Sequence, residues 1–400
     1  MRLILCLFLL GVVTQFNAQQ TYEPGKLTDS IPVSNTSNET FALYLPTSFV
    51  ASQASPILFI FEPAARGRLG IQTFIEASET YGHILVCSNN SKNGPYERNL
   101  NIAANLFDHV FSGFKINEDQ MYFAGFSGGS RLAWALAFAA GNIAGVIACG
   151  AGLWKAPSPI LPKQEFSYVG ICGIRDMNYR EMLGIKAYQE EINQDHTLIT
   201  FEGGHSWPPA EEIARAFDWL DIEAHKKGIK VKTDNELFRS YRHNYEIAEK
   251  AEANGHILEA VENYERVLST YGSLYTLDTV SARLKVIKKE SSYKRALKDR
   301  TLALEKEKQW TSTFYERFTT DYNEPDKIDM QWWEKKITQL NDKYADGGIE
   351  FQRMLERVQY NLFAIAFSRK NPLLYQSNED QKSFCTELGK LVYLESGQKQ

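Results

Sequence analysis

The chain has few cysteines, and they are not spaced like the ligands of a metal site. Four of the five, all except Cys6 near the N-terminus, are scattered, with no C-x-x-C pair and no zinc spacing. We therefore expect no metal site, and no cofactor is expected either. Cys87, Cys149 and Cys172 each lie in an apolar run typical of a strand, where cysteine acts as a small buried side chain. Because Cys149 and Cys172 fall on consecutive expected strands, a disulfide between them stays open.

The sequence also has little net charge and no long apolar run beyond its N-terminus. Its formal net charge is −5 at pH 7, and its basic residues form no face-sized cluster before residue 225. This balance excludes an extended basic surface, so we expect no nucleic-acid partner. No later stretch is long and apolar enough to cross a membrane, so we expect no membrane span.

The N-terminus has the pattern of a bacterial signal peptide. Met1–Arg2 is a short basic start, Leu3–Val13 is apolar, and Asn17–Gln19 offers a small residue for cleavage. The pattern predicts a signal peptide over residues 1–18 and an exported protein, periplasmic or extracellular. A membrane anchor is the alternative, but the apolar run is short for a span.

The remaining chain has the composition and length of a folded protein with two domains. Hydrophobic residues make up 44% of the full sequence and aromatic residues 12%, which excludes a disordered chain. We expect an α/β domain over residues 19–228 and a helical domain over residues 229–400.

Short apolar runs alternate with segments of helical spacing from residue 40 to residue 225. This alternation predicts a mainly parallel sheet with helices on both faces, whose reactive groups lie at the carboxyl ends of the strands. Residues 19–40 are polar and are expected to be a loop. The expected strands are 40–46, 56–62, 83–87, a strand starting at 121, 143–150, 166–174 and 196–201, and the expected helices are 71–81, 99–114, a helix ending near 140, 182–194 and 210–225.

From about Lys226 the charge density rises, and no strand-like run follows. Small residues in Asn244–Thr270 make this segment resemble one helical hairpin of the tetratricopeptide (TPR) type, in which two antiparallel helices pack closely. The helical domain is a candidate for binding a protein partner. Its tryptophans are interpreted as packing residues rather than as a ligand cage; they are Trp310, Trp332 and Trp333.

A glycine-rich turn follows the apolar run that starts at Met121. Residues Gly125–Gly129 form a G-x-S-x-G pattern. To project the hydroxyl of Ser127 above the end of a sheet, the chain must reverse sharply and hold this residue at a strained positive φ. Only very small side chains fit two residues before and two after it. Ser127 is therefore the candidate nucleophile.

A serine nucleophile needs a base, and the base needs an orienting carboxylate. In a hydrolase of this architecture their order along the chain is serine, acid, histidine. Of the histidines beyond Ser127, only His205 lies just past the carboxyl end of an expected strand. Asp176 directly follows its strand, whereas Asp195 precedes one and Glu202 is too close to His205. The candidate triad is Ser127, Asp176 and His205.

Residues 40–225 resemble an α/β-hydrolase, and specifically the secreted esterases of the polyhydroxybutyrate depolymerase, feruloyl esterase and acetyl xylan esterase types. The matching pieces are GFSGGS at Ser127, GIRD at Asp176, GGHSWP at His205 and the strand-to-loop stretch PILFIFEPAARGR. The resemblance implies hydrolysis of an ester through an acyl-enzyme, with Ser127 as nucleophile, His205 as base and Asp176 as orienter. The implied substrates are small-molecule or polymer-linked esters, such as polysaccharide-linked acyl groups or polyesters.

The sequence departs from this group at the oxyanion-hole loop, which usually has His-Gly and here has Glu62-Pro63. Pro63 has no N–H, so the expected donors are the backbone N–H groups of Gly128 and of Ala64 or a neighbour. An acidic Glu62 would be unfavourable there unless it were paired.

We expect Glu62 to pair with Arg66 or Arg68. Arg66 and Trp207 are tentative substrate-binding residues. Two alternatives to an esterase stay open: a serine peptidase of the same fold, and a catalytically idle hydrolase fold that binds a partner through its helical domain.

Overall fold

The structure is a computed structural model that describes residues 22–152 and 164–395. The signal peptide expected at residues 1–18 lies outside the described residues. Within the described ranges, none of the helices combines the length and the apolar character needed to cross a membrane. No group of three or more potential metal ligands was found among the same residues.

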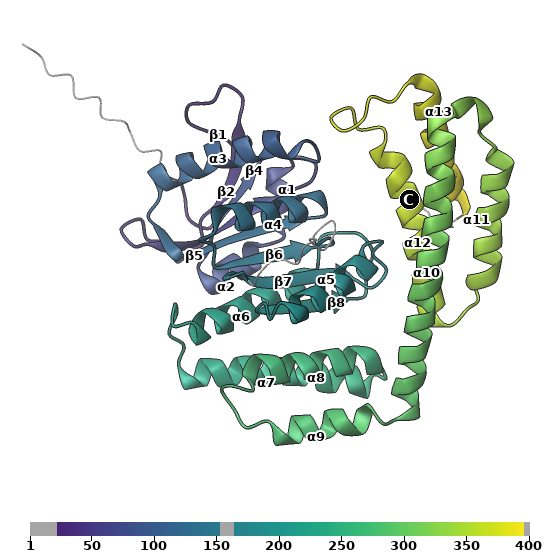
Figure 1. Ribbon diagram of the computed structural model, residues 1–400. Coiled ribbons are helices and arrows are strands. Elements are labelled where there is room, and N and C mark those ends of the chain that lie inside the picture. Colours follow the sequence, from purple (N-terminus) through teal and green to yellow (C-terminus); the bar gives the residue numbers. More distant parts are fainter. Residues whose placement is uncertain (1–21, 153–163, 396–400) are drawn as a thin grey trace, which may run out of the picture.

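An eight-stranded sheet forms the centre of the N-terminal part (Figure 1). The β2 strand is antiparallel to both of its neighbours, β1 and β4, and all other pairs are parallel. This order is that of the α/β-hydrolase fold. Across the sheet the strands are β1 (Leu27–Pro32), β2 (Thr40–Tyr44), β4 (Ile84–Ser88), β3 (Ser55–Phe61), β5 (Ile116–Phe126), β6 (Gly145–Cys149), β7 (Ser167–Gly173) and β8 (His196–Phe201).

Helices cover both faces of the sheet, as predicted. One core lies under α3 (Tyr96–Gly113), α4 (Gly128–Ala140) and α5 (Tyr179–Glu191). The other lies under α1 (Gly67–Gln72), α2 (Ile75–Tyr81) and α6 (Ala210–Lys226). Alternate residues of β3 enter the two cores, which is why this strand is a continuous apolar run.

The loop expected over residues 19–40 is partly wrong, because the structure forms strand β1 there. This strand lies at the edge of the sheet and pairs only with β2 among the described strands. Most of its residues are half-buried or exposed. An edge strand without a buried face lacks the apolar alternation by which strands are recognised in a sequence.

The C-terminal part is helical, as predicted. Its α-helices are α7 (Asp234–Ala253), α8 (Ile257–Tyr271), α9 (Asp278–Ile287), α10 (Ser291–Asn323), α11 (Met330–Tyr344), α12 (Ile349–Ser368) and α13 (Glu379–Glu395), with a short 3₁₀ helix at Pro325–Lys327.

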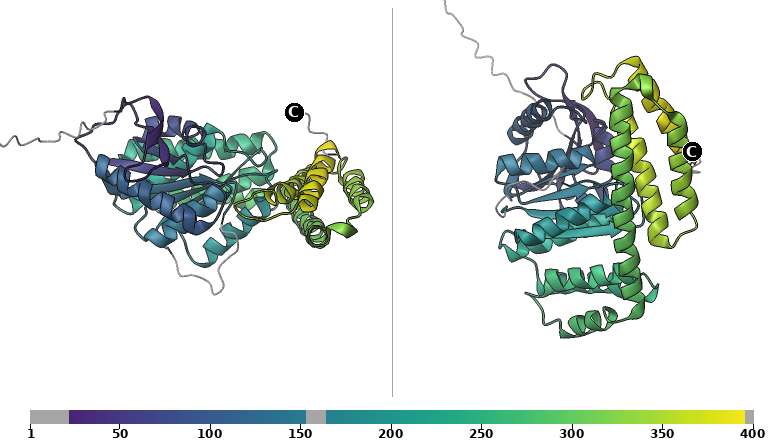
Figure 2. Two further views of the ribbon diagram at one scale, coloured as in Figure 1. Left: turned by 90° about the horizontal axis from the view of Figure 1, so that it is seen from above. Right: turned by 45° about the vertical axis from the view of Figure 1, so that its right-hand side comes forward.

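Helices α7 and α8 pack as a pair against α6, and the small residues Ala248, Ala251 and Ala260 are buried between them. The next helices do not repeat the pair: α9 has 10 residues and α10 has 33. Helix α10 runs beside the sheet from the level of α9 up to α13 (Figures 1 and 2). The TPR-type resemblance of the hairpin therefore stays a prediction.

The C-terminal half of α10 packs with α11, α12 and α13 around a separate apolar core. Trp333 is fully buried there, and its Nε1 donates a hydrogen bond to Asp321 Oδ2 at 2.8 Å. Trp310 and Trp332 pack against the same core. The interpretation of these tryptophans as packing residues is confirmed.

The four described cysteines are free and buried. The disulfide left open between Cys149 and Cys172 does not form. Cys149 pairs in register with Ile171 on β7, so Cys172, the next residue, points to the opposite face of the sheet. Accordingly, the two thiols belong to different apolar clusters.

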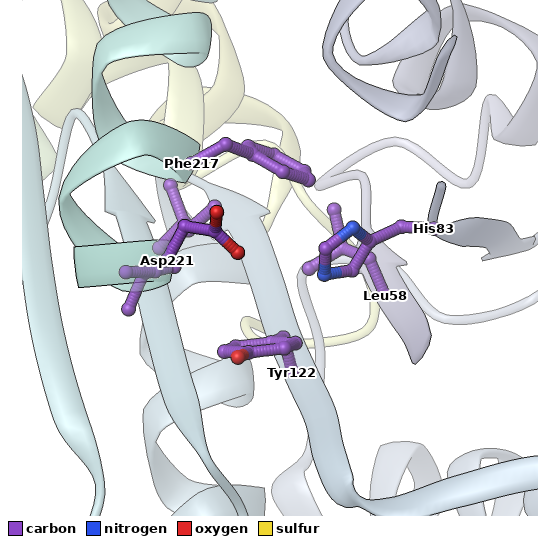
Figure 3. Close-up of a pocket in the computed structure, with 7 residues that line it drawn as sticks. Leu58, His83, Tyr122, Phe217 and Asp221 are labelled. Carbon is purple, nitrogen blue, oxygen red and sulfur yellow. The ribbon is translucent and has the colours of Figure 1, made fainter. Parts of the chain in front are cut away.

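A small cavity of about 10 Å³, lined by both apolar and polar side chains, lies between the sheet and α6, at the amino end of β4. Figure 3 shows the imidazole of His83 facing the carboxylate of Asp221, with Tyr122 beside them. Burial lowers the pKa of His83 to about 3, so this histidine is neutral in the folded protein at physiological pH. The cavity lies at the opposite end of the strands from Ser127 and is not part of the site described next.

Candidate active site

Ser127 occupies a sharp turn between β5 and α4. Its φ is 53° and its ψ is −118°, so the predicted positive φ is confirmed. A Cβ atom added to Gly125 would lie 2.3 Å from the carbonyl oxygen of Gly129, and one added to Gly129 would lie 1.9 Å from that of Phe61. Only glycine fits at both positions, as the G-x-S-x-G pattern requires.

The structure brings the three candidate catalytic side chains into one hydrogen-bonded chain. His205 Nε2 lies 2.9 Å from Ser127 Oγ. On its other side, His205 Nδ1 lies 2.9 Å from both carboxylate oxygens of Asp176. Asp176 is fully buried, and its Oδ1 also accepts the backbone N–H of Asn178 at 2.8 Å. This geometry is the one that a nucleophile, its base and an orienting acid require, so the three residues remain the candidate triad.

The ends of β7 and β8 bring acid and base together. The backbone N–H of Ile174 donates to the carbonyl of Phe201, and that of Arg175 donates to the carbonyl of Gly203, both at 2.9 Å. These bonds continue the pairing of the two strands into the loops that carry Asp176 and His205. Neighbouring parallel strands end at the same edge of a sheet. The positions of Asp176 and His205 in the sequence were therefore sufficient to predict that their side chains meet.

The expected oxyanion donor at Ala64 is already bonded within its own loop. Glu62 is buried, and its Oε2 accepts the backbone N–H of Ala64 at 2.7 Å and that of Arg66 at 3.0 Å. The N–H of Ala65 donates to the Glu62 carbonyl at 3.1 Å. Since Pro63 has no N–H, all the backbone donors from residue 63 to residue 66 are absent or bonded to Glu62.

The pairing expected for Glu62 is found with Arg66, whose Nε donates to Glu62 Oε1 at 3.1 Å. This hydrogen bond to Glu62 raises the pKa of Arg66. Arg66 does not line the pocket at Ser127, and neither does Trp207. The Trp207 ring packs against Phe74 and Phe126, with ring centroids 5.7 and 5.3 Å away. The two tentative substrate-binding residues therefore lie outside the pocket wall: Arg66 pairs with Glu62, and Trp207 packs against Phe126.

A pocket of about 650 Å³ opens beside Ser127. Its walls come from both parts of the chain. From the α/β part, Phe61, Asn93, Leu132 and the ion-paired Arg131 line it. The helical part supplies one wall through α12 and the loop after it: Asn361, Ala364, Ile365, Ser368, Leu374 and Tyr375.

A charged and aromatic face of α12 holds this wall against the α/β part. Arg357 is buried, donates to Glu307 Oε2 at 2.7 Å and donates to the Ile174 carbonyl at 2.8 Å. One turn later, the Tyr360 ring lies 5.6 Å from the ring of His205.

Further ion pairs on the same face join Arg175 to Glu356 and Arg353 to Glu202, the latter at 2.8 Å. No motif in the sequence singles out these α12 residues. Their helical spacing shows that they share one face, but nothing in the sequence tells what that face contacts.

Comparisons with known proteins give likenesses of fold at low identity. No protein-family model matches the chain, and no curated protein matches it. Among solved structures, the substrate-bound fluorophosphonate-binding serine hydrolase F of Staphylococcus aureus is 16% identical, with a TM-score of 0.41, and the match covers 50% of this chain and 99% of that one.

The S-formylglutathione hydrolase of the same organism is 14% identical, with a TM-score of 0.39, over 50% of this chain and 99% of that one. Esterase 2 of Thermogutta terrifontis, phosphonylated by sarin, is 10% identical, with a TM-score of 0.40, over 53% of this chain and 99% of that one. At such identities and scores, chemistry has to be argued from the residues of the site itself. Those residues form, on an α/β-hydrolase fold, the hydrogen-bonded chain of Ser127, His205 and Asp176.

Proposed function

We propose that the protein is a serine esterase that hydrolyses carboxylic esters through an acyl-enzyme intermediate. The observation that carries this proposal is the chain of hydrogen bonds from Ser127 Oγ through His205 to the buried Asp176. The strained φ of Ser127 supports it, because such strain is typical of functional sites.

In the proposed mechanism, Ser127 Oγ attacks the carbonyl carbon of the ester while His205 Nε2 accepts its proton. Asp176 holds Nδ1–H and stabilises the imidazolium that forms. The tetrahedral intermediate collapses, and the alcohol leaves with the proton from His205. Water then attacks the acyl-enzyme in the same way, which releases the acid and restores Ser127.

Three features around the triad suit this chemistry. Helix α4 begins at Gly128, so its N-terminal N–H groups and dipole favour the negative charge of the intermediate. The Phe126 ring lies 4.7 Å from the His205 ring and limits its movement. The His205 side chain is only 8% exposed, which keeps bulk water away from the proton-transfer path.

The pocket size falls within the usual range for small-molecule sites, about 300–1,000 Å³. Its walls combine apolar side chains such as Leu132 and Ile365 with polar ones such as Asn361 and Tyr375. We propose a small-molecule ester or an acyl group linked to a polysaccharide or polyester as substrate, cleaved outside the cytoplasm after export. We propose that α12 takes part in substrate selection. A protein partner for the helical part stays a prediction.

A catalytically idle binding protein is the second candidate. One observation favours it: Glu62 occupies the Ala64 N–H, which was expected to stabilise the oxyanion. A fluorophosphonate probe distinguishes the two, because it reacts covalently with an activated serine whatever the natural substrate is.

We expect the probe to label the wild type at Ser127, and the protein to hydrolyse p-nitrophenyl acetate. Ser127→Ala should lose both properties while staying folded. Ser112→Ala, at an exposed serine on α3, is the matched control and should keep both. Unlabelled wild-type protein without esterase activity would favour the idle protein.

A further inference from the structure

The proposed esterase chemistry needs hydrogen-bond donors directed at the oxyanion, and one of the two expected donors is occupied. Loss of a single oxyanion donor typically costs about 10²- to 10³-fold in rate. The backbone donors that follow β3 are directed at Glu62. The Gly128 N–H at the start of α4 remains, so a second donor has to come from elsewhere in the pocket.

Asn93 is the residue next to the remaining donor. It lies in the loop between β4 and α3 and lines the same pocket as Ser127 and Gly128. A Cβ atom added to Gly128 would lie 1.8 Å from Asn93 Oδ1, 2.8 Å from its Cγ and 3.3 Å from its Nδ2. The side-chain amide therefore packs directly on the residue that supplies the first donor. We propose that the side-chain amide of Asn93 is the second oxyanion donor of the esterase.

The backbone of Asn93 is held from two sides. Its N–H donates to the carbonyl of Pro63 at 2.8 Å, and its carbonyl accepts Asn371 Nδ2 at 3.1 Å. Lys92, just before it, forms a β-bridge with Ala64. The bond to Pro63 holds Asn93 against the loop whose own N–H groups are bonded to Glu62. The bond from Asn371 holds it against the helical part. The fixed backbone keeps the side-chain amide beside Gly128, so only the terminal amide has to turn to present a donor.

The Asn93 side chain is free to donate. It is exposed to the pocket, and within the described ranges it makes no hydrogen bond. Of the two polar atoms of the amide, Oδ1 is the nearer to Gly128. Rotation of the terminal amide by a half-turn exchanges Oδ1 with Nδ2 and presents an N–H at the same place. A neutral amide suits the task, because it donates without adding a charge to the pocket.

Two substitutions at Asn93 test the inference, which rests on the proposed esterase function. With p-nitrophenyl acetate as substrate, Asn93→Ala should lower kcat by about 10²- to 10³-fold with KM changed by less than about threefold. Asn93→Asp keeps the shape and places a carboxylate at the oxyanion, so it should lose at least as much. Asn101→Ala and Asn101→Asp, at an exposed position on α3, are matched controls expected to behave as wild type.

Inhibition by a boronic acid, which mimics the tetrahedral intermediate, distinguishes a donor from a packing residue. For a donor, inhibitor affinity should fall across the Asn93 variants in proportion to kcat/KM, at an unchanged melting temperature. If Asn93 only packs, Asn93→Asp should keep the activity. If Asn93 only binds substrate, its substitution should raise KM and leave kcat unchanged.

A double-mutant cycle adds a second measurement. Gly128→Ala should lower kcat because its new methyl group displaces the amide, and it should cost much less in the Asn93→Ala background. If the probe labelled the wild type at Ser127 and both Asn93 variants had the same kcat as the wild type, this inference alone would be wrong. A wild type with neither labelling nor turnover would overturn the proposed function and this inference together.

Discussion

Arg357 Nη1 donates a hydrogen bond to the backbone carbonyl of Ile174 at 2.8 Å. The acceptor lies two residues before Asp176, at the end of β7, and the donor lies in the middle of α12. This partly buried contact joins the helical part of the chain to the loop that carries the acid of the candidate triad. The helical part is therefore built into the site and forms part of its wall.

Removal of Arg357 should destabilise the protein strongly. Arg357→Met leaves Glu307 buried without its partner, and breaking such a pair typically costs about 3–5 kcal/mol of unfolding free energy. The double variant Arg357→Met/Glu307→Leu should lose clearly less, because no unpaired charge stays buried. Urea unfolding measures both. Equal losses in the single and double variants would contradict this view of the ion pair.

Replacement of the acid should remove most of the activity without loss of substrate binding. Asp176→Asn keeps an acceptor for the Asn178 N–H but no longer fixes Nδ1–H of His205 or stabilises the imidazolium. We expect kcat to fall by about 10⁴-fold with little change in KM. Steady-state kinetics with an aryl acetate checks this, with Asp119→Asn at an exposed position as the control. A loss below about tenfold would exclude Asp176 as the orienting acid.

Enlarging a side chain on α12 should change substrate preference. Ala364 lines the pocket opposite the α/β part, so Ala364→Phe fills space that a long acyl chain or a bulky alcohol would need. We expect kcat/KM for a p-nitrophenyl octanoate to fall by about tenfold or more relative to the acetate. Phe367→Ala, at an exposed position on the same helix, should leave the ratio unchanged. An unchanged ratio in Ala364→Phe would show that α12 does not select the substrate.

The buried His83 should make stability depend on pH. Burial lowers its folded pKa to about 3, whereas an unfolded histidine has a pKa of about 6.5. Below pH 6.5 the unfolded state binds the extra proton, so the contribution of His83 to stability is lost as the pH falls from about 6.5 towards 3.

Between pH 7.5 and pH 4.5 this amounts to about 2–3 kcal/mol. His83→Phe keeps an aromatic ring against Tyr122 and Phe217. Its unfolding free energy should therefore fall less than that of the wild type between these two pH values. Urea unfolding of both proteins at the two pH values measures the difference. Parallel curves for variant and wild type would contradict the assignment.

Patterns in the sequence were sufficient to predict seven of the eight strands, the helices on both faces of the sheet and the order of the candidate triad. These features depend on local patterns. Apolar runs such as β3 become strands buried on both faces. The sharp turn at Ser127 leaves room only for glycine at positions 125 and 129, and the sequence has glycine at both. Since carboxyl ends of parallel strands meet at one edge, the strand-end positions of Asp176 and His205 were enough to predict their meeting.

The groups that complete the site come together through contacts between distant segments of the folded chain. The carboxylate of Glu62 accepts the Ala64 N–H that was expected to bind the oxyanion. This bond depends on the conformation of an irregular loop, which the sequence pattern does not reveal. The amide of Asn93 meets Gly128, and Asn371 bonds to Asn93 from 278 residues further along the chain. The sequence shows which residues share a face of α12. What that face contacts is fixed by buried charges and tight packing between distant segments, and these form only when the two parts of the chain come together.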